Sequence, residues 1–297
     1  MGTVPDLSKY ERFQDVTQGK MRYYEAGTGR TVLLIHATGA HSSAEHFLFM
    51  FELLAAKYHV VAPDLIGFGK STRALVNGPT FEIIVDSIRE FMNNLGIESA
   101  DFIGQGSGAW FCGLLAYESP HLVRSMTGIG SAGLNEEAVA SIANYQPFNR
   151  ENTKKQIGNS VFEGSQLTWE GVDALVDSRG SHATNPSGEE AFEALKPLVH
   201  QMVTPGIRKC YLLQRRLPHM KMPILWMWST SEHIEPGPTW TSEWESTGGD
   251  PSKGSKPWVA PNAQYYLMRL GTHHFDWEYP KETVQVCSEF IDSVSQT

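Results

Sequence analysis

One short stretch, residues 101–110, constrains this chain more than any other. It reads as an apolar strand that runs into a glycine-rich corner and then into a helix. Gly104 and Gly108 have the spacing of a G-x-S-x-G turn, which lifts one side chain above a sheet while its glycines let neighbouring backbone approach closely. The central position of this turn is Gly106, so the residue expected to carry a nucleophile has no side chain.

Apolar, β-branched segments alternate with helical stretches on both sides of this corner. The predicted strands cover residues 21–25, 31–35, 59–64, 126–130, 223–228 and 265–270, and the predicted helices cover 81–95, 107–119 and 283–294. This alternation predicts an α/β fold whose sheet is mostly parallel and buried on both faces. Ligands of such sheets bind at the carboxyl ends of the strands, where the corners at His36 and Gly106 are expected to meet.

The strand pattern disappears from about residue 135 to residue 217, where helical segments of mixed polarity take over. We interpret residues 135–217 as a helical cap, or lid, inserted into a core formed by residues 1–134 and 218–297. The segment 237–261 is rich in Gly, Pro, Ser and Trp and is longer than most loops of a compact domain. Whether this segment covers a pocket or contacts a partner is left open.

Composition narrows the partners to a small molecule. The net charge is −9 over 297 residues and no Lys/Arg cluster occurs, which argues against nucleic acid and anionic membranes. No run of about 18 apolar residues is long enough to span a membrane, and the first residues lack the layout of a signal peptide. We therefore expect a cytoplasmic enzyme. The three cysteines are widely spaced and indicate neither a disulfide framework nor a metal site.

Several segments carry a resemblance to a known family. They are residues 36–39, 63–71, 104–109, 229–232 and 273–278. In this order they resemble the α/β-hydrolase superfamily over nearly the whole chain, with its parallel sheet and inserted helical cap. Within the superfamily, residues 132–161 and 273–280 are similar to the meta-cleavage-product hydrolases. That likeness implies a cofactor-independent, metal-free enzyme that cuts a carbon–carbon bond beside a ketone in dienol-keto acids, and allows a homodimer.

The resemblance also implies which residues act. His273 takes the place of the general base, and Glu232 that of the acid that orients it. His274, where the family usually has tryptophan, remains the alternative base. The backbone amides of Thr38 and Ser107 take the positions of the oxyanion hole. The Ser107 side chain, one residue past the apex, points about 100° away from it and is expected to cap the helix or line the pocket.

Further side chains are expected to contact substrate. They are His36, Gln105, Trp110, Leu175 and His274. Relatives that bind a substrate carboxylate use a cap arginine, but residues 169–177 contain none, although Arg179 is close. Leu175 in that stretch favours an apolar or aromatic-derived ketone or ester.

Gly106 leaves more than one function open. Either a serine enzyme has lost its nucleophile, or the chain is a natural serine-less form; retention of His273 and Glu232 favours the first. The leading hypothesis is a hydrolase of a carbon–carbon bond beside a ketone, or of an ester-like carbonyl. The alternatives are a lyase, isomerase or cyclase that uses His273 without a nucleophile, and a binding protein that keeps the pocket as a receptor.

Overall fold

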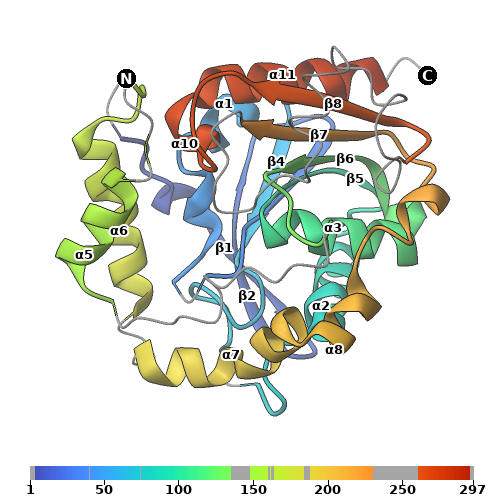
Figure 1. Ribbon diagram of the computed structural model, residues 1–297, viewed down its shortest axis with the longest axis horizontal. Helices are drawn as coiled ribbons and strands as arrows, with labels where there is room; N and C mark the ends of the chain where they lie inside the picture. Colours follow the sequence, from blue (N-terminus) through green and yellow to red (C-terminus); the bar gives the residue numbers. More distant parts are fainter. Residues whose placement is uncertain are drawn as a thin grey trace.

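The computed structural model of the chain describes residues 4–39, 41–73, 75–134, 148–159, 161, 164–183, 188–229 and 260–294. One eight-stranded sheet forms its centre (Figure 1), in the order β1-β2-β4-β3-β5-β6-β7-β8. The strands are β1 (Glu11–Val16), β2 (Gly19–Ala26), β3 (Thr31–Ile35), β4 (His59–Pro63), β5 (Ala100–Gln105), β6 (Val123–Ile129), β7 (Ile224–Ser229) and β8 (Ala263–Met268). β1 and β2 pair antiparallel, and all pairs from β4 to β8 are parallel. The predicted mostly parallel α/β fold is confirmed.

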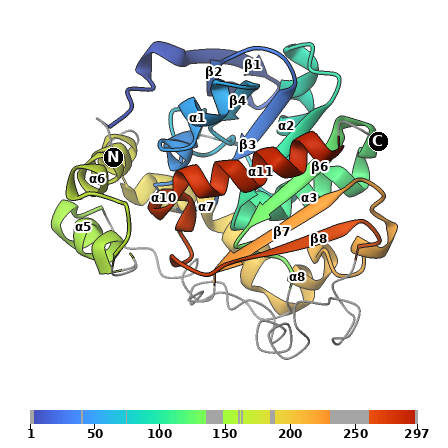
Figure 2. The ribbon, with the colours of Figure 1, turned by 90° about the horizontal axis from the view of Figure 1, so that it is seen from above.

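Helices cover both faces of this sheet (Figure 2). On one face lie α2 (Phe81–Asn94) and α3 (Ser107–Glu118), and on the other lie α1 (Phe51–Ala55) and α11 (Pro280–Val294). Side chains of β3 alternate between the two cores. Leu33 and Ile35 pack towards α2 and α3, whereas Val32 and Leu34 pack towards α1 and α11. Burial on both faces explains why the central strands are uninterrupted apolar runs.

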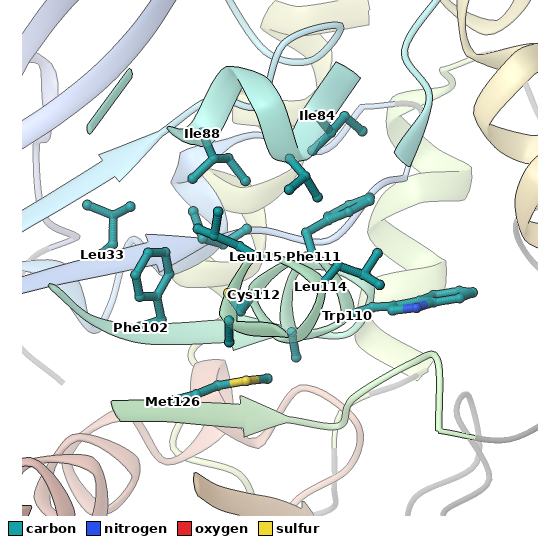
Figure 3. Close-up of a cluster of buried hydrophobic side chains, with 14 of the residues drawn as sticks. Leu33, Ile84, Ile88, Phe102, Trp110, Phe111, Cys112, Leu114, Leu115 and Met126 are labelled. Atoms are coloured by element: carbon teal, nitrogen blue, oxygen red, sulfur yellow. The ribbon is translucent and has the colours of Figure 1, made fainter. Parts of the chain in front are cut away.

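Figure 3 shows how the face under α2 and α3 is filled. Leu33, Phe102 and Met126 project from three strands towards Ile88 of α2 and Leu115 of α3, and each is buried. Burial of one such side chain stabilises the fold by about 1.5–3 kcal/mol. This core fixes α3 against the sheet, and the first turn of α3 therefore has a fixed position above β5.

Helix α2 forms where its sequence predicts it. The Thr80 side chain accepts a hydrogen bond from the Ile83 amide and so caps the first turn. Ile84, Ile88 and Phe91 form the buried stripe on the sheet. Gly96 follows the last turn with φ +69°, the left-handed conformation in which glycine ends many helices.

Strand β1 escaped the sequence analysis. Of its residues only Val16 is buried, because the strand lies at the edge of the sheet and pairs with β2 alone. No apolar alternation marks it, and pairing with β2 holds it in place. The predicted boundaries of the other strands agree with the structure to within two or three residues.

In the described residues between β6 and β7, four α-helices follow one another. They are α5 (Arg150–Asn159), α6 (Trp169–Ala183), α7 (Gly188–Val203) and α8 (Pro205–Tyr211). α5 packs on α6 and α7 on α8, and in Figure 1 the first pair lies at one side of the molecule and the second pair below α2. Among the described helices, none combines the length and the apolar character that crossing a membrane requires.

Candidate active site

The glycine-rich corner joins β5 directly to α3. Gly106 stands between them with φ +54° and ψ −122°, a backbone conformation that favours glycine. A Cβ atom at Gly104 would lie 2.5 Å from the backbone of Ala109, and one at Gly108 would lie 2.1 Å from the carbonyl oxygen of Ile35. Both flanking glycines are therefore required for the helix to start this close to the sheet.

His273 faces the bare apex of this corner. It follows β8 in the turn before α10 (Phe275–Glu278), and 5% of its surface is exposed. A Cβ atom built on Gly106 would lie 3.9 Å from His273 Nε2 and 3.3 Å from the Cβ of Ala37. A hydroxyl on that Cβ would be within hydrogen-bonding reach of the imidazole. Position 106 and His273, predicted to act together, are thus adjacent.

Gln105 contacts the His273 imidazole at Nε2, the nitrogen that faces position 106. Its side-chain nitrogen lies 2.8 Å from His273 Nε2, and the side chain is fully buried. With this amide as the donor, Nε2 accepts and the ring proton resides on Nδ1. The carboxamide of Gln105 therefore makes the hydrogen bond to His273 Nε2 that a hydroxyl at position 106 would otherwise make.

Thr38 and Ser107 also meet, in a way that the sequence does not reveal. The Thr38 amide donates a hydrogen bond of 2.8 Å to Ser107 Oγ, and the two hydroxyl groups lie 2.7 Å apart. Both residues are buried. The Ser107 hydroxyl thus accepts the hydrogen bond of the Thr38 amide, which is one of the two amides that were expected to bind an oxyanion.

Comparison with known proteins agrees with this architecture. Residues 30–237 match the family model described as the alpha/beta hydrolase fold. The chain belongs to the α/β-hydrolase family. This membership makes it an α/β-fold hydrolase, and the assignment of the corner at Gly106 as the nucleophile elbow stays a prediction.

Relatives of this α/β-hydrolase include enzymes of known name. The chain is 27% identical over 205 residues to 2-hydroxymuconate semialdehyde hydrolase of Pseudomonas sp. strain CF600, which covers 68% of this chain and 71% of the relative. It is 23% identical to a 2-hydroxy-6-oxononadienedioate/2-hydroxy-6-oxononatrienedioate hydrolase of Paraburkholderia phymatum, over 97% of each chain. A meta-cleavage product hydrolase from Pseudomonas fluorescens IP01 superposes with a TM-score of 0.73 at 20% identity, over 92% of this chain and 94% of that chain. The last likeness supports the fold.

In this hydrolase, the His36 side chain is buried and contacts backbone groups through both ring nitrogens. The side chain is fully buried, Nδ1 lies 2.7 Å from the carbonyl oxygen of Ala37, and Nε2 accepts a hydrogen bond of 3.0 Å from the Leu65 amide. Burial lowers the pKa of His36 to about 3. Both ring nitrogens contact backbone groups, so His36 joins the corners after β3 and β4, and its predicted contact with substrate stays a prediction.

The pKa of His36 predicts how stability responds to acid. In the unfolded chain the imidazole binds a proton near pH 6.5, whereas the folded chain excludes it until about pH 3. The contribution of neutral His36 to the free energy of unfolding is therefore complete above pH 6.5. It is lost as the pH falls, by up to about 1.4 kcal/mol per pH unit. Urea titrations of His36→Gln should show a smaller loss between pH 7 and pH 5 than the parent chain. Equal losses in both would contradict the assignment, and exposed His121→Gln is the control.

Trp110 and Leu175 lie in packed cores. Trp110 is fully buried, its indole nitrogen donates a hydrogen bond of 2.8 Å to the carbonyl oxygen of Tyr211, and its ring packs 4.6 Å from that of Phe81. Leu175 of α6 is 3% exposed, in the core on the opposite face of the sheet. Both side chains contribute to packing, and their predicted contact with substrate stays a prediction.

Part of the predicted site lies outside the described residues. Glu232 and residues 237–259 of the long loop belong to this part. The acid that would orient His273 therefore remains a prediction, as do the lid boundaries and the loop's function.

Two sets of contacts near His273 were not found from the sequence, one around Trp277 and one between His46 and Asp276. The His274 ring stacks on Trp277 with centroids 3.8 Å apart and meets the His273 ring edge-on at 4.9 Å. The Arg179 guanidinium lies 5.5 Å from the Trp277 ring centroid. His46 lies 2.7 Å from Asp276, 230 residues away in sequence, and only folding brings them together.

Proposed function

We propose that this α/β-hydrolase acts on a carbon–carbon bond beside a ketone in a dienol-keto acid, or on an ester-like carbonyl. The observation that carries the proposal is the placement of His273 Nε2 at 3.9 Å from the Cβ position of residue 106. The named relatives hydrolyse substrates of this class. A base facing the elbow apex supports the same acyl chemistry here.

The proposed reaction uses His273, position 106 and two backbone amides. His273 moves a proton that converts the dienol to its keto form, and a serine at position 106, or a water in its absence, then adds to the ketone. The Thr38 and Ser107 amides stabilise the oxyanion, once the Ser107 hydroxyl turns away from Thr38. After addition of serine, collapse breaks the carbon–carbon bond to give an acyl-serine ester and a dienolate, and a water activated by His273 then hydrolyses the ester to the carboxylic acid. After direct addition of water, collapse gives the carboxylic acid and the dienolate in one step. Glu232 would hold the imidazolium.

Arg179 supports a carboxylate-bearing substrate. Desolvation lowers the pKa of its guanidinium to about 10, so it stays charged at neutral pH. Within the described part of the chain, no carboxylate forms an ion pair with it. A partly buried cation without an acidic partner suits an anionic ligand. This modifies the expectation from Leu175 of a less acidic substrate.

Replacement of Arg179 should weaken binding of the acid. We expect Arg179→Met to raise the dissociation constant of a dienol-keto acid about 10- to 100-fold, the value of a charge-assisted hydrogen bond. Calorimetry with the Gly106 chain measures binding without rapid turnover. The methyl ester should bind both proteins alike, and exposed Arg215→Met should bind the acid as the parent does. Equal affinities of Arg179→Met and the parent for the acid would refute this assignment.

We further propose that the helices α5–α8, within residues 135–217, form a lid over the elbow, that the enzyme is cytoplasmic, and that it forms a homodimer. Helical insertions between core strands of this fold commonly cover the carboxyl ends of the strands.

A second candidate is a lyase or isomerase that needs no nucleophile. One observation favours it: the Gln105 side chain already hydrogen-bonds to His273 Nε2, so the imidazole is held in place without a hydroxyl at position 106. Turnover of the dienol-keto acid by the chain with Gly106, lost in His273→Ala, would support this candidate. Turnover that appears only in Gly106→Ser supports the hydrolase.

A further inference from the structure

Three potential ligands gather beside His273, and of these only His274 was considered for the reaction, as the alternative base. They are His46 from the short helix η2 (Ala44–Phe47), His274, and Asp276 of α10. One nitrogen or oxygen from each lies within 4.8 Å of the others. We call these three residues the His46 cluster.

Asp276 gives the cluster an unbalanced charge. Its side chain is fully buried, and Oδ2 lies 2.7 Å from His46 Nε2. Oδ1 is also buried and accepts no hydrogen bond. Among the described lysines and arginines, none forms an ion pair with Asp276. A buried carboxylate oxygen with no partner is costly, and a bound cation is one of the few ways to compensate it.

The surrounding residues hold the two imidazoles in place. His274 stacks on the Trp277 indole, and the Trp277 nitrogen donates a hydrogen bond of 2.8 Å to the carbonyl oxygen of His46. The His274 amide donates to Thr272 Oγ1 at 3.3 Å. Thr272 in turn donates to the buried Glu278 carboxylate. Supporting contacts of this kind orient the ligands of metal sites.

We propose that the His46 cluster binds a divalent cation of the zinc class. Two imidazoles and one carboxylate suit such an ion and leave a coordination position open. Ligand atoms around tetrahedral zinc lie about 3.3 Å apart, given bond lengths of about 2.0–2.2 Å. His46 and Asp276, now 2.7 Å apart across a shared proton, would open slightly as the metal replaces that proton, and the remaining ligand atoms would move together.

The site would place a metal next to the proposed base. The His273 and His274 rings lie 4.9 Å apart. Arg179, over the Trp277 ring, opposes a cation, so we expect an affinity in the micromolar range instead of the tighter values of structural zinc. The proposal does not depend on the reaction assigned to position 106.

Metal titration of the untagged chain tests the site. After treatment with a chelator, the chain should bind about one equivalent of Zn²⁺ in competition with a chromophoric chelator, and Co²⁺ should give a visible absorption band of a nitrogen- and oxygen-ligated ion. His46→Ala and His274→Phe should each weaken Zn²⁺ binding about 100-fold, because each removes a ligand; phenylalanine keeps the stacking on Trp277. Circular dichroism verifies that both variants fold.

A matched control comes from the His59–Glu25 pair. His59 Nε2 lies 2.8 Å from Glu25, as in the cluster, but the described residues supply no third ligand there. His59→Ala should leave Zn²⁺ affinity unchanged. Absence of stoichiometric binding in the parent chain, or binding retained in both His46→Ala and His274→Phe, would overturn the proposal and leave the His46–Asp276 contact as a hydrogen bond that joins η2 to α10.

Discussion

Gly106→Ser should raise kcat/KM for p-nitrophenyl acetate by about 10³-fold or more over the chain with glycine. Loss of the nucleophile of a serine hydrolase costs about 10⁶ in kcat, and water activated by a histidine recovers only part of this. The new Cβ would stand 3.9 Å from His273 Nε2, so the hydroxyl can take the hydrogen bond now made by Gln105. The same variant should cleave a dienol-keto acid.

Gly106→Ser should at the same time be less stable. A side chain at φ +54° and ψ −122° is strained, and its Cβ approaches that of Ala37 to 3.3 Å. Strain of this kind costs about 1–3 kcal/mol, which thermal unfolding would detect. Gly106→Ala is the matched control: it should show the same loss of stability without any gain in activity.

Two further variants decide which groups act. Gly106→Ser with His273→Ala should lose the gained activity, because no base remains to activate the hydroxyl. Ser107→Ala in the Gly106→Ser background should stay active, because the Ser107 hydroxyl is bound to Thr38. A Gly106→Ser protein that folds but gains no hydrolysis of either substrate would refute the proposed nucleophile position, and loss of all activity in Ser107→Ala would move the nucleophile to Ser107.

Asp64→Ala should lower the free energy of unfolding by about 3–5 kcal/mol. Asp64 follows β4 and is fully buried; it accepts hydrogen bonds of 2.7 Å from the Arg22 guanidinium and from the amides of Ala44 and Lys70. Burial alone would lower the pKa of Arg22, but Asp64 and Glu45 raise it above its usual range, so the guanidinium remains charged. Removal of Asp64 leaves that buried cation with one acidic partner fewer and two amides unpaired.

Urea denaturation at neutral pH measures this effect. Lys196→Ala is a suitable control, because Lys196 and Glu193 form an ion pair whose side chains are more than half exposed, and its loss should change stability by less than about 0.5 kcal/mol. The double variant Arg22→Met with Asp64→Ala should lose less than the sum of the two single variants, because the unpaired cation is gone. A loss below about 1 kcal/mol in Asp64→Ala would contradict the network's importance.

The fold could be predicted where the chain pattern is local. The apolar strands, the span of α2 and the glycine spacing at residues 104–108 depend on neighbours within a few residues, so the sequence predicts them. Strand β1 was missed because an edge strand buries little and leaves no alternation. Trp110 and Leu175, expected to contact substrate, are buried in packed cores, and the sequence does not separate these two roles because an apolar side chain suits a pocket wall and a packed interior equally well.

The sequence by itself determined the α/β architecture and the bare apex at Gly106, and the resemblance that it carries predicted His273 as the partner of that apex. Only the tertiary structure decided what else the polar groups do: Gln105 holds His273, the Ser107 hydroxyl occupies the Thr38 amide, and His46 meets Asp276 across 230 residues. The physical reason is that hydrogen bonds and ion pairs act over about 3 Å. Which polar atoms come that close depends on how the strands and helices pack, and no short-range pattern in the chain records it.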